Sequence, residues 1–209
     1  MYAYYKNTFR DNRIQHEQLI PKIPLHEKNI NNCQIVLNRQ ALLSKLKSNG
    51  IVAEIGVDTG EFSALIKEKT HPSVFHLIDI WGSERYDTRK YNYVLERFEK
   101  QIKNGEVIVH RKRSLEAVND FTDYYFNWIY IDTVHNYETT RDELKAYSNK
   151  VKHDGIIAGH DYTMGGYVEE VRVGVIEAVH EFCVEHNWEI VYLTIDPIEK
   201  QSFAIKRIN

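Results

Sequence analysis

Residues 52–63 read VAEIGVDTGEFS, and this stretch decides the expected fold. The run Ile51–Val57 has the near-continuous apolar character of a strand that is covered on both faces. Gly56 and Gly60 follow at a G-x-x-x-G spacing, and glycine lets the backbone turn sharply and approach a ligand closely. We therefore expect a strand, a glycine turn and a helix, which is how a ligand-binding α/β sheet begins.

Strand-like and helix-like segments alternate along the rest of the chain. Further apolar runs lie at Val74–Ile80, Glu106–His110, Asn127–Asp132 and Gly155–His160, and amphipathic stretches lie near Glu61–Lys69, Thr88–Lys103, Glu138–Asn149 and Val168–His186. This alternation predicts βαβ units and a parallel sheet. The last two runs, Trp188–Ile195 and Ser202–Ile208, are too close for a helical crossover, so we expect them to be antiparallel. The expected fold is α/β, with a doubly wound, mostly parallel seven-stranded sheet and an antiparallel last strand.

Length and composition fit one globular domain with an N-terminal extension. The chain has 209 residues, of which 43% are hydrophobic and 27% charged, as is ordinary for a domain with a core. Residues 1–48 are polar, contain Pro21 and Pro24, and are expected to form an arm and a cap helix near Asn38–Ser48. Residues 49–209 are expected to form the cofactor-binding domain.

Charge and cysteine content restrict the classes of partner and compartment. The net charge of -3 argues against a nucleic-acid partner, and the lack of a run of about 18 apolar residues argues against a membrane span. The N-terminus carries charges where a signal peptide needs an apolar run. Cys33 and Cys183 show no metal-ligand or redox spacing, so we expect a reducing, cytoplasmic location.

Two carboxylates mark the ends of the first two expected strands. Glu54 would suit an ammonium or hydroxyl ligand and would repel a pyrophosphate, and the G-x-G-x-x-G spacing of a dinucleotide site is absent. Asp79 lies about twenty residues beyond the turn, where an acidic group can accept hydrogen bonds from both ribose hydroxyls. The alternatives are glycines that serve only the turn, and an Asp79 that caps a helix or is solvated.

Four segments together resemble a known family. In order they are EIGVDTG at 54–60, LIDIW at 77–81, IDTVHNYE at 131–138 and GIIAGHDY at 155–162. They resemble class I S-adenosylmethionine-dependent methyltransferases with a Rossmann-like fold, in particular the small macrocin-type and cephalosporin-hydroxylase-type O-methyltransferases. The likeness covers about residues 50–207, and D-x-x-H-x-Y-E followed by G-H-D-Y is its most selective part.

The resemblance implies S-adenosylmethionine as the cofactor and assigns residues to it. Residues around its methionine portion would be Glu54, Gly56, Asp58 and Gly60. Asp79 would hold the ribose and Ser114 would lie beside the adenine. Asp132 would contact the cofactor and also take part in catalysis. For the neighbouring Arg113, a charge exposed at the surface is as good an explanation as a position beside the adenine.

A metal site is expected where the fourth and fifth strands end. Asp132 and Asp161 follow these strands, and neighbouring strands lie about 4.8 Å apart, so the carboxylates would repel unless a cation lay between them. Relatives bind a metal through an acidic residue on the fourth strand and an acidic pair after the fifth. Here the pair is His160-Asp161, so the expected ligands are Asp132, His160 and Asp161, for Mg²⁺ or another divalent metal.

Methyl transfer requires an aligned acceptor oxygen and a group that removes its proton. Some relatives carry an aspartate where this chain has Val134, so His135 is the preferred base, with His160 and Asp132 as the other catalytic residues. Structural or solvated histidines are the alternative.

We therefore expect metal-assisted O-methylation of a small hydroxylated acceptor, such as a sugar, a glycan or a natural-product-like molecule. Two other functions stay open: a nicotinamide-dependent oxidoreductase, and a non-catalytic module that only binds the cofactor. A homo-oligomer in which the arm docks between subunits also stays open.

Overall fold

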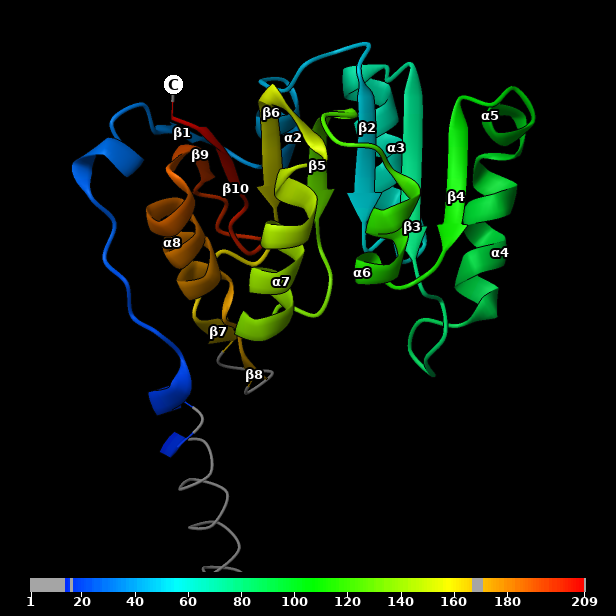
Figure 1. The fold of residues 1–209 in the computed structure, drawn as a ribbon. Coiled ribbons are helices and arrows are strands. Elements are labelled where there is room, and N and C mark those ends of the chain that lie inside the picture. Colours follow the sequence, from blue (N-terminus) through cyan, green and yellow to red (C-terminus); the bar gives the residue numbers. More distant parts are fainter. Residues whose placement is uncertain (1–13, 16, 167–170, 209) are drawn as a thin grey trace, which may run out of the picture.

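The computed structural model describes residues 14–15, 17–166 and 171–208. An eight-stranded sheet runs through these residues in the order β1-β9-β10-β6-β5-β2-β3-β4 (Figure 1). The strands are β1 (Gln34–Val36), β2 (Ile51–Ile55), β3 (Val74–Asp79), β4 (Val107–Arg111), β5 (Phe126–Ile131), β6 (Val151–Gly159), β9 (Trp188–Thr194) and β10 (Phe203–Arg207). A short antiparallel ribbon of β7 (Gly165–Gly166) and β8 (Val171–Arg172) stands apart from the sheet.

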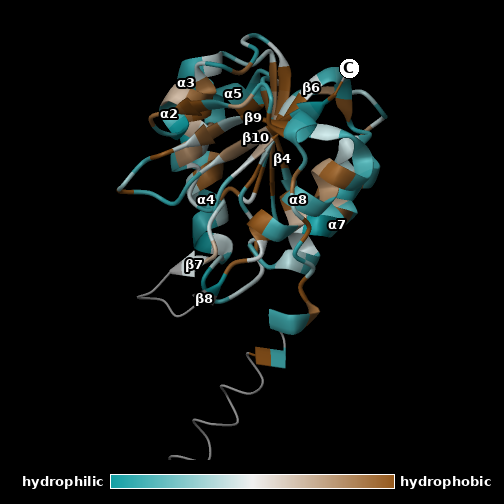
Figure 2. Ribbon diagram, turned by 90° about the vertical axis from the view of Figure 1, so that its left-hand side faces the viewer, coloured by the Kyte–Doolittle hydropathy of each residue, from teal (hydrophilic) through white to brown (hydrophobic). Residues whose placement is uncertain are grey.

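Helices cover both faces of the sheet (Figure 2). On one face lie α2 (Arg39–Leu43), α3 (Glu61–Thr70), α4 (Thr88–Arg97) and α5 (Glu99–Lys103). On the other lie α6 (Ser114–Ala117), α7 (Tyr137–Ser148) and α8 (Val175–His186). Short 3-10 turns occur at η1 (Glu27–Asn29) and η2 (Val118–Asp120). Each layer has its own buried apolar cluster, which is why the central strands read as continuous apolar runs.

The strand directions confirm the predicted doubly wound, mostly parallel sheet. The neighbours β4, β3, β2, β5 and β6 pair in parallel, whereas β10 is antiparallel to both β6 and β9. The predicted number of seven strands is wrong. The eighth strand, β1, comes from the expected arm and pairs in parallel with β9 at the sheet edge. It has three residues, two of them exposed, so its sequence has no apolar run from which a strand could be predicted.

Three predicted helices differ from the observed ones. The cap helix near Asn38–Ser48 shortens to the five residues of α2. The stretch Thr88–Lys103 breaks at Phe98, whose backbone leaves the helical region and separates α4 from α5. The last helix begins at Val175 instead of Val168, which itself lies outside the described residues. Gly174 precedes it in close contact with the backbone of Tyr137, where an added Cβ would overlap that backbone.

The carboxyl ends of the parallel strands meet at one edge of the sheet, which we call the rim. In Figure 1 the arrows of β2, β4 and β6 point to it. Four non-glycine residues that follow these strands have left-handed backbones: Asp58 (φ 54°), Trp81 (φ 40°), His135 (φ 62°) and Asp161 (φ 57°). Non-glycine residues with positive φ occur at the opposite edge as well, so these backbones do not by themselves single out the rim. Ligands of doubly wound α/β sheets bind outside the carboxyl ends of the strands, and the rim is therefore where a site is expected in this fold.

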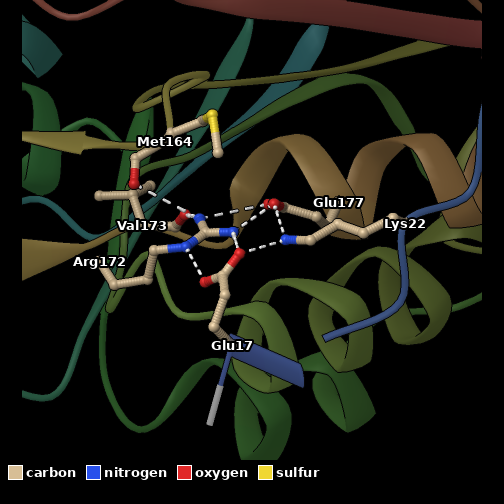
Figure 3. A network of polar contacts seen from close by, with 6 residues as sticks. All are labelled: Glu17, Lys22, Met164, Arg172, Val173 and Glu177. Carbon is tan, nitrogen blue, oxygen red and sulfur yellow. Dashed lines mark hydrogen bonds and ion pairs between the residues drawn. The ribbon is translucent and has the colours of Figure 1, made fainter. Parts of the chain in front are cut away.

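An ion-pair network ties the arm to the segment that follows the rim (Figure 3). Arg172 donates from Nε to Glu17 at 2.6 Å and also pairs with Glu177 on α8. Lys22 donates to Glu17 at 2.6 Å and to Glu177 at 2.8 Å. The described part of the arm thus packs against β8 and α8.

None of the helices in the described ranges is both long and apolar enough to cross a bilayer.

Candidate active site

The glycine turn after β2 is clamped between the two neighbouring strands. Gly56 donates its backbone N–H to Ile78 at 2.8 Å, and the N–H of Asp132 donates to Ile55 at 2.7 Å. Gly56 has a φ of 88°, and a Cβ added there would overlap the carbonyl oxygen of Asp132. Only glycine therefore fits at this crossing of the three strand ends.

Asp79 connects the glycine turn to the loop after β3. One of its carboxylate oxygens accepts the N–H groups of Val57 at 2.9 Å and Asp58 at 3.1 Å, and the other accepts that of Trp81 at 3.1 Å. The buried indole of Trp81 donates in turn to the carbonyl of Asp58 at 2.9 Å. Asp58 also forms an ion pair with Lys90. These contacts join the glycine turn to the loop after β3 and to α4.

Glu54 lies under the same turn and is almost fully buried. The hydroxyl of Ser63, in the first turns of α3, donates to its carboxylate. Burial raises the pKa of Glu54 well above its ordinary value, which favours the protonated form.

Ser114 begins α6 directly after β4. Its carbonyl accepts the hydroxyl of Tyr147 at 2.8 Å, and its side chain lies beside the buried Glu143. Thr133 donates to that same carboxylate at 2.7 Å. Glu143 thereby links the loops that follow β4 and β5, so Ser114 lies at the rim with the other predicted cofactor residues.

The loops after β5 and β6 bring two carboxylates and two imidazoles together. His135 Nδ1 lies 2.8 Å from Asp161 Oδ2 and 3.9 Å from Asp132 Oδ1. His160 Nδ1 lies 3.6 Å from a carboxylate oxygen of each aspartate. The four residues that we expected to carry the metal and the catalysis therefore form one cluster.

The charges of this cluster are strongly coupled. Burial raises the pKa of Asp132, against the opposing effect of the two histidines. Burial would also raise the pKa of Asp161, but hydrogen bonds from His135 and His160 bring it well below its ordinary value. Burial alone would lower the pKa of His160, yet the two aspartates raise it. These shifts favour the ionised form of Asp161 and the protonated form of His160.

These groups suit a divalent metal ion by donor chemistry and spacing. Ligand atoms of Asp132, His135 and Asp161 all lie within 4.8 Å of one another. Two carboxylates with one imidazole is a set that Mg²⁺, Mn²⁺ or Fe²⁺ accepts. The imidazole in this set is that of His135, whereas we expected His160. The Nε2 atom of His160 is buried without a hydrogen-bond partner among the described residues, beside a small cavity that Thr133 and Thr140 also line.

Sequence reasoning missed three charged residues at the rim. Arg39, in the first turn of α2, pairs with Glu199 at 2.6 Å. Lys200, next to Glu199 in the turn between β9 and β10, lies 3.3 Å from Asp161 Oδ1. A signal was present, because β9 runs in the same direction as β6 and the predicted hairpin must therefore turn at the rim. By the same logic, the helix before β2 must begin there.

Comparisons with known proteins place this geometry in a family. Residues 53–162, which contain the turn, Asp79 and the whole cluster, match the profile of the methyltransferase-domain family. No curated protein matches the chain by sequence.

Solved structures share the fold at low sequence identity. A Corynebacterium glutamicum protein superposes with a TM-score of 0.58 at 11% identity, over 96% of this chain and 89% of its own. A caffeoyl-CoA O-methyltransferase-like protein from Staphylococcus aureus gives 0.58 at 16%, over 96% and 91%. A methyltransferase-like protein from Streptococcus mutans, in complex with S-adenosylhomocysteine, gives 0.55 at 15%, over 80% and 93%. With more than half of its length matched by the family profile, the chain belongs to the methyltransferase-domain family and has the fold of class I S-adenosylmethionine-dependent methyltransferases.

Proposed function

We propose that this methyltransferase transfers a methyl group to a hydroxyl of a small molecule, such as a sugar, a glycan or a natural-product-like compound. The observation that carries the proposal is the pair of Asp161 and His135, 2.8 Å apart, at the rim beside Asp132. A carboxylate that orients an imidazole is the arrangement of a general base, which a neutral hydroxyl acceptor needs.

The ends of β2, β3 and β4, which we call the cofactor half of the rim, are proposed to hold S-adenosylmethionine. When bound, it supplies a methyl group that its sulfonium already activates. The Gly56 turn lets a ligand approach the backbone, and the carboxylate of Asp79 has acceptor capacity left for a ribose hydroxyl. Glu54 and Ser114 border the same part of the rim.

The ends of β5 and β6, with the turn between β9 and β10, are called the acceptor half. His135 uses Nδ1 toward Asp161, which leaves Nε2 for the proton of an acceptor hydroxyl. Asp161, held ionised, would stabilise the imidazolium that forms. With no metal bound, His160 lies between both aspartates and can offset their charge.

A divalent metal is proposed to assist in the same half. Asp132 and Asp161 would hold it, with an imidazole from His135 or His160 as the third ligand. The chemistry it would supply is polarisation of the acceptor hydroxyl. His135 would serve as the base only where His160 is that ligand.

The test is formation of S-adenosylhomocysteine from S-adenosylmethionine with a panel of hydroxylated acceptors, with Mg²⁺ and with EDTA. We expect product with at least one sugar-like or phenolic hydroxyl, and a His135→Ala variant that keeps cofactor affinity but loses turnover. Cofactor binding without turnover on any acceptor would favour the non-catalytic module. Binding of NADH in place of S-adenosylhomocysteine would favour the oxidoreductase.

A further inference from the structure

Arg39 reaches the rim from α2, outside the residues that the sequence assigned to the cofactor. Its guanidinium carbon lies 4.4 Å from the centre of the Phe62 ring. Phe62 follows the glycine turn directly and packs on Tyr130, with 4.6 Å between the ring centres. The next residue, Ser63, donates to Glu54. The half-buried charge of Arg39 therefore lies beside the turn that is proposed to hold the methionine portion of the cofactor.

Glu199 orients the guanidinium of Arg39, but some of its N–H donors have no partner among the described residues. Its Nε–Nη2 edge donates to the two carboxylate oxygens of Glu199, at 2.6 and 2.9 Å. An arginine carries five N–H donors in a planar fork. Within the described residues the Nη1 group makes no hydrogen bond, so the Nη1–Nη2 edge stays available for a second carboxylate. Glu199, on the outer edge, fixes the plane in which that second pair would form.

Two acidic side chains lie close enough to Arg39 for its charge to affect their pKa values. Burial raises the pKa of both Glu54 and Asp132, and the nearby charge of Arg39 opposes both shifts. The amino and carboxylate groups of a free amino acid are attached to one carbon. A site for them must therefore place hydrogen-bond acceptors for the amino group beside a cation for the carboxylate, as Glu54, Asp132 and Arg39 are placed here.

Two lysines of the rim are less suitable. Lys90 is paired with Asp58. Lys200 lies beside Asp161 in the acceptor half. Both are ammonium groups that act as point charges, whereas the fork of Arg39 matches the geometry of a carboxylate.

We propose that the Nη1–Nη2 edge of Arg39 binds the carboxylate of the methionine portion of S-adenosylmethionine, with Glu199 as the residue that positions the guanidinium. This inference rests on the proposed cofactor and adds the element that recognises its amino-acid end. It also gives α2 a function, because the short cap helix carries the cation to the rim.

The test compares two ligands that differ only in the carboxylate. Binding of S-adenosylhomocysteine and of its decarboxylated analogue, S-adenosyl-3-thiopropylamine, is measured by calorimetry on the full chain, for wild type, Arg39→Ala, Arg39→Lys and Lys103→Ala. Lys103 is 70% exposed at the edge of the sheet opposite the rim, so its variant controls for the loss of a positive charge. Thermal unfolding of each variant checks that it folds.

We expect Arg39→Ala to weaken S-adenosylhomocysteine about 10- to 100-fold and to leave the affinity for the analogue within about twofold. Arg39→Lys should fall between wild type and Arg39→Ala for S-adenosylhomocysteine, and Lys103→Ala should change neither affinity. Equal losses for both ligands in Arg39→Ala, or no loss for either, would overturn this inference alone. Failure of the wild type to bind S-adenosylhomocysteine would overturn the proposed function and this inference with it.

Discussion

The two halves of the rim are built differently, although both follow parallel strands of one sheet. In the cofactor half, both oxygens of Asp79 accept backbone N–H groups, the Trp81 indole donates to Asp58, and the carboxylate of Asp58 pairs with Lys90. In the acceptor half, Asp132 and Asp161 crowd around two imidazoles, and one imidazole nitrogen is buried without a partner among the described residues. Hydrogen bonds within the protein preorganise the first half. The second half holds two close carboxylates, whose charge a metal can balance.

The largest effect that separates the halves is expected from Asp161→Asn. The variant removes the charge that orients His135 and that we propose for metal binding. Turnover should fall about 10²- to 10⁴-fold, metal affinity should drop, and affinity for S-adenosylhomocysteine should stay within about twofold. Initial-rate kinetics and calorimetry measure the three quantities. Unchanged metal affinity would remove Asp161 from the metal site.

The next effect tests the cofactor half by steric exclusion. In Gly56→Ala the new Cβ would overlap the carbonyl oxygen of Asp132, at a φ of 88° that is unfavourable for alanine. We expect at least about 100-fold weaker S-adenosylhomocysteine binding and a loss of roughly 2–4 kcal/mol in the free energy of unfolding. Gly105→Ala is the matched control, because its φ is 74° and its Cβ would meet no atom within 4 Å. Equal behaviour of the two variants would contradict the steric argument.

A smaller effect distinguishes ligand binding from catalysis. Asp79→Ala removes the acceptor that joins Val57, Asp58 and Trp81 and that is proposed to hold the ribose. Affinity for S-adenosylhomocysteine should fall about 10- to 100-fold, while kcat at saturating S-adenosylmethionine changes only a few-fold. Steady-state kinetics show this as a raised KM. A variant with normal KM and reduced kcat would assign Asp79 to the chemistry instead.

The smallest effect concerns the stability of the strands below the cofactor half. His76 on β3 is buried, contacts His110 at 2.9 Å and Tyr125 at 3.1 Å, and burial lowers its pKa to about 4. The unfolded chain takes up the proton near pH 6.5 but the folded chain does not. Stability is therefore complete above about pH 6.5 and falls toward pH 4, by about 2 kcal/mol at pH 5.

Urea unfolding of wild type and His76→Gln at pH 7 and pH 5 checks this. The variant should show a smaller difference between the two pH values than the wild type, and the rest comes from other groups whose pKa burial lowers, such as His110. An identical difference in both proteins would show that other groups cause the acid sensitivity.

Much of the architecture could be predicted because it follows from local patterns. Continuous apolar runs predicted the central strands. The short gap between Trp188–Ile195 and Ser202–Ile208 predicted the antiparallel hairpin. Once the strands are parallel, their carboxyl ends must meet, so Gly56 and Asp79 could be placed at one rim from spacing alone.

The parts that could not be predicted depend on tertiary contacts. The strand β1 exists because β9 offers it an edge, and its own three residues carry no period. Likewise, the choice of His135 over His160 as the imidazole closest to Asp161 follows from a left-handed backbone at His135, which no pattern of apolar residues encodes. Arg39 was missed because its partner Glu199 lies 160 residues away in the chain.

A crystal structure of the chain with S-adenosylhomocysteine tests the division of the rim most directly. We expect one ligand in the cofactor half, with its ribose on Asp79, its amino-acid end at the Gly56 turn, and its sulfur facing Asp132, while His135 and Asp161 stay uncovered. A ligand that covers His135 and Asp161, or that binds away from Gly56 and Asp79, would contradict it.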